Sequence, residues 1–184
     1  PAVSQAHRHG TLSMPLFRAK YWRWIHFFAF ELYWLAAVKF HANGICLLLA
    51  LLHLALTPTP RRDLRILPLS LLGIGVDFLL TYSGVFVFPS GFPLWMVAVW
   101  VGFILALPHG LGWLFEFHLG WQIVFGALGG ALSYFSAYAL GVVRFGYPLM
   151  LVIIGIAAIW ALLLPLLIHL ARIISTRYPD AVSD

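Results

Sequence analysis

The chain has 184 residues, of which 62% are hydrophobic and only 9% are charged, and its formal net charge is +5. Soluble domains are nearer half apolar and a quarter charged, so this composition excludes a soluble domain and predicts an exterior that faces lipid. The basic residues flank apolar segments and form no continuous basic face, which excludes nucleic acid as the expected partner. The single cysteine, Cys46, excludes an internal disulfide.

Six apolar segments follow one another along the chain, and we predict that each forms a transmembrane helix. The predicted helices cover residues 21–40, 42–56, 66–88, 94–114, 119–143 and 147–174. They form one domain (21–174), preceded by a polar cytoplasmic tail (1–20) and followed by a second tail (175–184). The predicted fold is therefore all-α, a polytopic transmembrane bundle of six helices. Its weakest member is the second segment, which has only fifteen residues.

The orientation of the bundle follows from its Lys and Arg residues. Short connections rich in proline and glycine, such as 57–60 and 88–93, make neighbouring helices antiparallel. If six helices alternate, only Lys39 and Arg144 of the 11 Lys and Arg residues lie opposite the termini. Because basic residues are retained on the cytoplasmic side, we predict that both termini are cytoplasmic.

The third segment carries a narrow polar stripe centred on Asp77. Small or polar residues recur there at steps of three and four, at positions 70, 73, 77, 81 and 84. Asp77 is eleven residues from the start of the segment, which predicts a position near mid-membrane. A charged group there costs at least ~2.5–3.5 kcal/mol, so Asp77 should face the bundle. It is either a hydrogen-bonded pin between helices or a group that binds a ligand or handles protons.

Glu31 is the second acid within an apolar segment. Lys39 follows eight residues later, about 12 Å along the helix axis and ~80° around it, so the two side chains are not expected to pair. Lys39 is expected at the outer interface with His41. Glu31 therefore needs a partner from another helix, and the histidines are candidates.

Four histidines lie in or beside apolar segments, at positions 26, 53, 109 and 169. His109 ends a small-residue face of the fourth segment formed by Ala98, Gly102 and Ala106. No spacing pairs two histidines for haem, and no His-Glu-x-x-His, Cys-x-x-Cys or Ser-His-Asp pattern is present. The sequence thus assigns no metal ligands and leaves any cofactor unknown, and each histidine is otherwise a packing or interfacial residue.

Two sets of candidate residues follow from these stripes. Small residues on one helix face allow close approach of a neighbouring backbone. The residues predicted to pack helices are Gly126, Gly130, Ser133 and Gly141 of the fifth segment and Gly73 and Gly84 of the third. The residues predicted to bind a ligand or handle protons are Asp77, Glu31, His109, Tyr134, Trp100 and His53. Among these, Asp77, His109 and Tyr134 are expected to face the interior.

Motifs spread along the apolar segments also suggest a family. The stretches that carry the resemblance are 30–38, 73–77, 93–96 with Trp100, 107–114, and 126–134 with 140–141. On these residues the chain resembles an uncharacterised family of small bacterial inner-membrane proteins, catalogued as a domain of unknown function. Glu31 and Ala131 depart from that family's pattern, which commonly has glutamine and proline there. The resemblance implies a multi-pass protein of the bacterial inner membrane that accompanies lipid-modifying proteins.

Three functions fit these features. The first is a non-enzymatic accessory or binding subunit for a lipid or another apolar ligand, or a component of a larger membrane complex. Its expected partners are membrane lipid and a further protein. An alternative is a small-solute transporter or its substrate-binding component, because six helices with this topology resemble vitamin-uptake components. A third is a lipid-modifying membrane enzyme that uses Asp77, Glu31 and His109 as acid–base groups.

Overall fold

The computed structural model describes the backbone of residues 13–177 and the side chains of residues 21 and 23–177. Its helices are α1 (Ser13–Phe40), α2 (Asn43–Leu56), α3 (Pro60–Ile66), η1 (Leu67–Leu69), α4 (Ser70–Tyr82), α5 (Leu94–Ala106), η2 (Gly112–Glu116), α6 (Leu119–Ala139) and α7 (Leu149–Arg177). Two short strands, β1 (Phe86–Val87) and β2 (Arg144–Phe145), lie in the connections. The prediction of an all-α fold is therefore confirmed.

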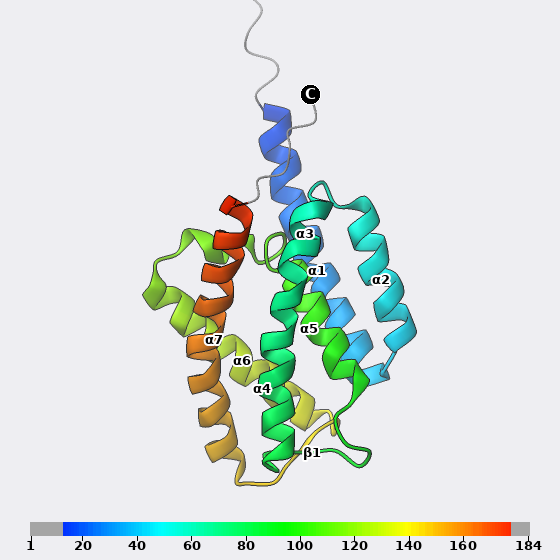
Figure 1. Ribbon diagram of the computed structural model, residues 1–184, viewed down its shortest axis with the longest axis vertical. Helices are drawn as coiled ribbons and strands as arrows, with labels where there is room; N and C mark the ends of the chain where they lie inside the picture. Colours follow the sequence, from blue (N-terminus) through cyan, green and yellow to red (C-terminus); the bar gives the residue numbers. More distant parts are fainter. Residues whose placement is uncertain (1–12, 178–184) are drawn as a thin grey trace, which may run out of the picture.

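Helices α1, α2, α4, α5 and α7 run up and down the long axis of the molecule, and α6 crosses it obliquely (Figure 1). The α2–α3 connection and the last turn of α7 lie at one end, which we call the terminal end. The α4–α5 and α6–α7 connections lie at the opposite end, which we call the ladder end because β1 and β2 pair there. Arg61, Arg62 and Arg65 lie on α3 at the terminal end, whereas Arg144 lies on β2 at the ladder end.

Helix α5 forms the centre of the bundle and contacts α1, α2 and α4. Its residues are apolar on every face, which is typical of a helix surrounded by protein. The predicted small-residue face is used here: a Cβ atom on Gly102 would lie 2.3 Å from the ring of Tyr33. Tyr33 also donates a hydrogen bond of 2.8 Å to the Ala98 carbonyl, which ties α1 to α5.

Two helices end earlier than the hydrophobicity predicts. Gly84 and Gly141 have φ values of 75° and 72° and follow the last turns of α4 and α6. After α4, the Val85 amide donates to the Leu80 carbonyl, and the Val142 amide does the same to Ala137 after α6. This is the Schellman pattern that ends a helix at a glycine. The prediction that Gly84 and Gly141 pack helices is therefore wrong: both are helix terminators, and a Cβ atom on either would meet nothing within 4 Å.

The chain beyond these two glycines forms the β ladder in place of helix. Phe86 pairs with Phe145 and Val87 with Arg144, in antiparallel register. Phe86 is buried and its ring stacks on Phe145. The ladder thus joins the α4–α5 and α6–α7 connections.

The other predicted boundaries also shift. Helix α1 begins at Ser13, inside the predicted polar tail, and α7 continues to Arg177. The basic stretch after Pro60, predicted as a connection, is helical, because proline fits the first turn of a helix. It runs without a break through η1 into α4. Helix α5 ends at Ala106, eight residues before the predicted end at 114. A turn that contains Pro108 follows Ala106.

Within the described residues, two helical spans are long and apolar enough to cross a membrane: Pro60–Tyr82 and Leu149–Arg177. Asn43–Leu56 and Leu94–Ala106 are also apolar, but shorter. The 14 residues of α2 correspond to about 21 Å of helix, less than the ~30 Å of a hydrocarbon core.

A candidate ligand cavity beside a buried carboxylate

Asp77 lies on the inner face of α4 and is only 1% exposed. Its Oδ1 atom accepts a hydrogen bond of 2.6 Å from the Tyr134 hydroxyl, and its Oδ2 atom accepts one of 2.6 Å from the Trp100 indole. The expected interior positions of Asp77 and Tyr134 are confirmed. Asp77 is five residues from the last residue of α4, Tyr82, and its position near mid-membrane stays a prediction.

Glycines create the space for the tryptophans around Asp77. A Cβ atom on Gly73 would lie 2.2 Å from the Trp100 ring. Trp100 stacks on Trp160 of α7, with ring centroids 5.2 Å apart and planes 11° apart. A Cβ atom on Gly130 would in turn lie 2.1 Å from Trp160 Cγ, and one on Gly126 would lie 2.3 Å from the Trp160 carbonyl oxygen. Close contacts therefore match the packing predicted for these three glycines.

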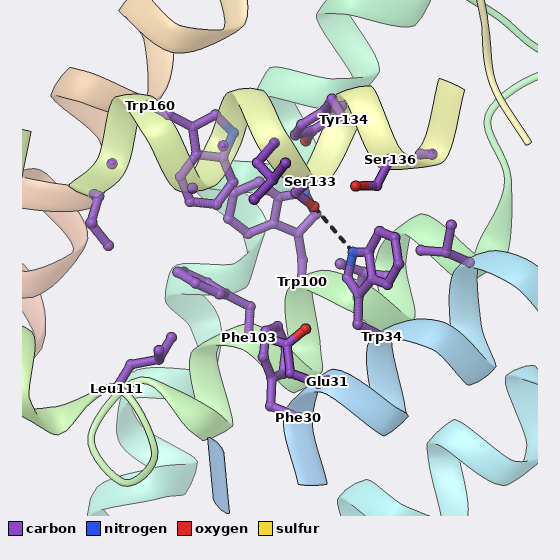
Figure 2. Close-up of a pocket in the computed structure, with 18 of the residues that line it drawn as sticks. Phe30, Glu31, Trp34, Trp100, Phe103, Leu111, Ser133, Tyr134, Ser136 and Trp160 are labelled. Atoms are coloured by element: carbon purple, nitrogen blue, oxygen red, sulfur yellow. Dashed lines mark hydrogen bonds between the residues drawn. The ribbon is translucent and has the colours of Figure 1, made fainter. Parts of the chain in front are cut away.

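A cavity of about 370 Å³ lies next to this group, between α1, α5 and α6 (Figure 2). Its wall is mostly apolar and aromatic, with Trp100, Phe103 and Trp160 on one side. Trp34 of α1 reaches across and donates a hydrogen bond of 3.1 Å to Ser133 Oγ of α6, as the dashed line in Figure 2 shows. Ser133, predicted as a packing residue, thus joins two helices through its hydroxyl.

The cavity reaches the surface between α1 and α6. Glu31, Gly129 and Leu132 line it and are nevertheless exposed. In the part of the chain that the structure describes, Glu31 makes no hydrogen bond or ion pair, so the expected partnership with a histidine is wrong there. Glu31 lies within α1 and the other two residues lie within α6, away from the helix ends, so the opening is on the side of the bundle. An apolar molecule would therefore enter from the side.

The histidines form a separate polar cluster at the terminal end. His109, buried just after α5 as expected, places its Nε2 atom 2.8 Å from Asp63 Oδ2. His53 Nε2 of α2 lies 3.2 Å from the same oxygen, and Thr57 Oγ1 donates to it over 2.7 Å. Asp63 Oδ1 accepts from Arg62 Nε over 3.2 Å. Asp63 itself is completely buried.

The sequence prediction missed several members of this cluster. His26 of α1 stacks on His109, with ring centroids 4.9 Å apart. The sequence places three of these residues in a polar connection: Asp63, Thr57 and Arg62. No sequence pattern indicates that their side chains face the interior. Only the helical conformation from Pro60 onward points Asp63 toward α2 and α5. The ligand atoms of His53, Asp63 and His109 lie within 4.8 Å of one another, so these three residues could hold a metal ion.

The structure thus divides the six candidate residues into two groups. Asp77, Glu31, Tyr134 and Trp100 line the cavity, whereas His109 and His53 belong to the histidine cluster. Among the residues that the structure describes, Asp77 accepts only from uncharged donors, whereas Asp63 also meets a guanidinium and two imidazoles. Of the three acid–base candidates, Asp77 and Glu31 line the same cavity, whereas His109 belongs to the histidine cluster.

Fold and site together define an all-α protein with a laterally open apolar cavity and a separate histidine cluster. Residues 23–166 match the family described as Protein of unknown function (DUF2878), and the chain belongs to that family. The resemblance to a family of unknown function is therefore confirmed. No curated protein and no solved structure matches the chain.

Proposed function

We propose that this protein spans the bacterial inner membrane several times and binds an apolar ligand in the cavity between α1 and α6. The ligand is an acyl chain of a membrane lipid or a molecule of similar shape. The cavity carries this proposal, because its 370 Å³ falls in the range of about 300–1,000 Å³ that is usual for small-molecule sites. The wall of the cavity is mostly apolar and aromatic, so its chemistry also suits an apolar ligand.

The outside of the bundle supports a membrane setting. Large apolar side chains are exposed along α2 and α7, including Leu48, Leu51, Ile154 and Leu162. Such continuous apolar surface is unfavourable in water but matches a lipid environment. The arginines of α3 lie at the terminal end, which accords with a cytoplasmic position for both ends of the described bundle.

The lateral opening supports a binding protein over a solute transporter. Lipid tails in the bilayer lie beside the gap between α1 and α6, so a tail can enter without crossing water. Glu31 at this opening supplies one acceptor for a polar group on the ligand. Trp34 and Ser133 join α1 and α6 beside this opening through their hydrogen bond. A subunit of a larger complex would be compatible with this role.

The experiment fills the cavity without disturbing the fold. Gly129 lines the cavity, and a Cβ atom there meets no other atom within 4 Å. Gly129→Phe should therefore place a ring in the cavity and reduce the lipid that co-purifies in mild detergent, measured by native mass spectrometry. Gly155→Phe is the matched control, because Gly155 of α7 is exposed, equally uncrowded and outside the cavity.

The result expected is at least a fivefold loss of bound lipid in Gly129→Phe and an unchanged amount in Gly155→Phe. Equal lipid retention by both variants would overturn the proposed site. A thermal unfolding scan of each variant shows whether the fold is intact.

A further inference from the structure

The histidine cluster at the terminal end has a geometry that ordinary hydrogen bonding does not satisfy. His109 Nε2 lies 2.8 Å from Asp63 Oδ2, 3.2 Å from Arg62 Nη2 and 3.4 Å from Thr57 Oγ1. A ring nitrogen carries either one proton or one lone pair, so it can donate to the carboxylate or accept from the guanidinium, but not both. One of these close approaches is therefore left without a hydrogen bond.

The same crowding occurs at the carboxylate. Asp63 Oδ2 lies within 3.2 Å of His53 Nε2 and within 2.8 Å of His109 Nε2, and it already accepts from Thr57. Two imidazole nitrogens and a carboxylate oxygen thus converge on one small, buried region. Convergence of electron-pair donors on a single point is the arrangement that a cation satisfies best.

We propose that His53 Nε2, His109 Nε2 and the Asp63 carboxylate bind one divalent transition-metal ion. Two histidines and one carboxylate are a ligand set of catalytic zinc sites and of non-haem iron(II) sites. The three ligands come from α2, α3 and the turn after α5, so the ion also links these elements at the terminal end. Three protein ligands leave at least one coordination position for water or a substrate.

Neighbouring side chains orient these ligands. Thr57 Oγ1 donates to Asp63 Oδ2, and Thr59 Oγ1 donates to Oδ1 over 3.3 Å. His26 stacks on His109 with ring planes 25° apart and meets the His53 ring edge-on. Such contacts hold an imidazole at one rotation, which is the usual role of groups around a metal site. The ligand set is therefore positioned before any ion binds.

Arg62 is the group that opposes a cation. Its Nη2 atom lies 3.2 Å from His109 Nε2, where the ion would sit. The Arg62 side chain is 24% exposed, so it can turn toward solvent when the metal binds. Arg62→Gln should consequently bind the metal at least as tightly as the natural chain, and more tightly at low ionic strength. If the cluster is only a structural set of salt bridges, neither the natural chain nor Arg62→Gln should bind the metal.

The test uses the full chain in mild detergent, stripped with a chelator and titrated with Co²⁺ and then Zn²⁺. His7 and His9 are changed to Ala in every sample, so that these two residues do not contribute. One equivalent of Co²⁺ should bind and give the strong visible bands of a four- or five-coordinate site, and Zn²⁺ should displace it. Asp63→Asn and His109→Gln should lose at least tenfold in affinity, whereas His169→Gln should not change.

His169 is the matched control because it is an exposed histidine of α7 outside the cluster. The proposal would be overturned if the protein with the unaltered cluster did not bind one equivalent of Co²⁺. It would also be overturned if both ligand variants still bound Co²⁺ as tightly. If the ligand variants fail to fold, the Co²⁺ titration of the protein with the unaltered cluster tests the proposal by itself. Cluster residues do not line the cavity. His109→Gln should therefore lose metal and keep its lipid, and Gly129→Phe should lose lipid and keep its metal, which separates this proposal from the function proposed above.

Discussion

Two aspartates of this protein are almost completely buried, yet their surroundings differ in kind. Asp77 is 1% exposed and accepts one hydrogen bond on each oxygen, from a phenol and an indole. Asp63 is 0% exposed and meets Arg62, two histidines and two threonines. The first belongs to an aromatic cavity inside the bundle, and the second to a charged cluster at the terminal end.

The difference shows how the same side chain serves two tasks. Uncharged donors around Asp77 fix the positions of two aromatic rings and leave the adjacent cavity apolar. The cationic and imidazole groups around Asp63 concentrate charge and metal-binding atoms where the bundle nears one end. The stability of a buried carboxylate among charged partners depends on those charges. The stability of a buried carboxylate among neutral donors depends on how the surrounding side chains pack.

Asp63→Ala should have the largest effect on stability, because it leaves Arg62 and the two imidazoles without their shared carboxylate. Removing one partner from a buried ionic group costs about 3–5 kcal/mol. Denaturant unfolding in detergent, monitored by helix content, measures the loss. Glu116→Gln is the control, since Glu116 pairs with Arg23 only at the exposed surface. Similar losses in both variants would show that the cluster contributes no more than a surface ion pair.

Gly73→Ala should have an intermediate effect, confined to the cavity region. The added Cβ atom would lie 2.2 Å from the Trp100 ring, so the indole must shift, which disturbs its hydrogen bond to Asp77 and its stacking on Trp160. Overpacking of this kind costs about 1–3 kcal/mol. Gly75→Ala on the same helix is the control, because its Cβ atom meets nothing within 4 Å. The midpoint of thermal unfolding should fall for Gly73→Ala and hold or rise for Gly75→Ala.

Tyr134→Phe should have the smallest effect, because it removes one hydrogen bond and keeps the ring that stacks on Phe86. Asp77 Oδ1 then loses its partner, at a cost of about 1 kcal/mol. Tyr138→Phe is the control: its ring stacks on Phe145 and its side chain is exposed. If chemical denaturation does not distinguish the two variants, the Asp77 carboxylate does not depend on Tyr134.

Helix existence could be predicted from hydrophobicity, whereas helix ends could not. All six predicted segments contain a helix, because apolar runs of this length bury their backbone polar groups most easily as helices. The ends at Tyr82 and Ala139 depend on Gly84 and Gly141, which adopt positive φ within otherwise apolar sequence. A glycine in a predicted helix can pack or terminate, and both uses occur in this chain.

For the cavity, spacing along a helix was informative. The stripe through Gly73 and Asp77 faces inward as predicted, because residues three or four apart share a helix face. The sequence did not reveal that Trp100, 23 residues away, and Tyr134, 57 residues away, both donate to Asp77. Partners from different helices depend on the rotation and depth of each helix, which no local pattern encodes.

The amino-acid sequence by itself determined the helical class of the protein, its family and the inward stripe of α4, because these depend on composition and local periodicity. Only the tertiary structure decided that His53, Asp63 and His109 meet, and that Glu31 stands at a cavity mouth instead of beside a histidine. The physical reason is that helical periodicity fixes which side chains share a face. Which faces then meet across the bundle is decided by side-chain packing, here by glycines that admit Trp100 and Trp160.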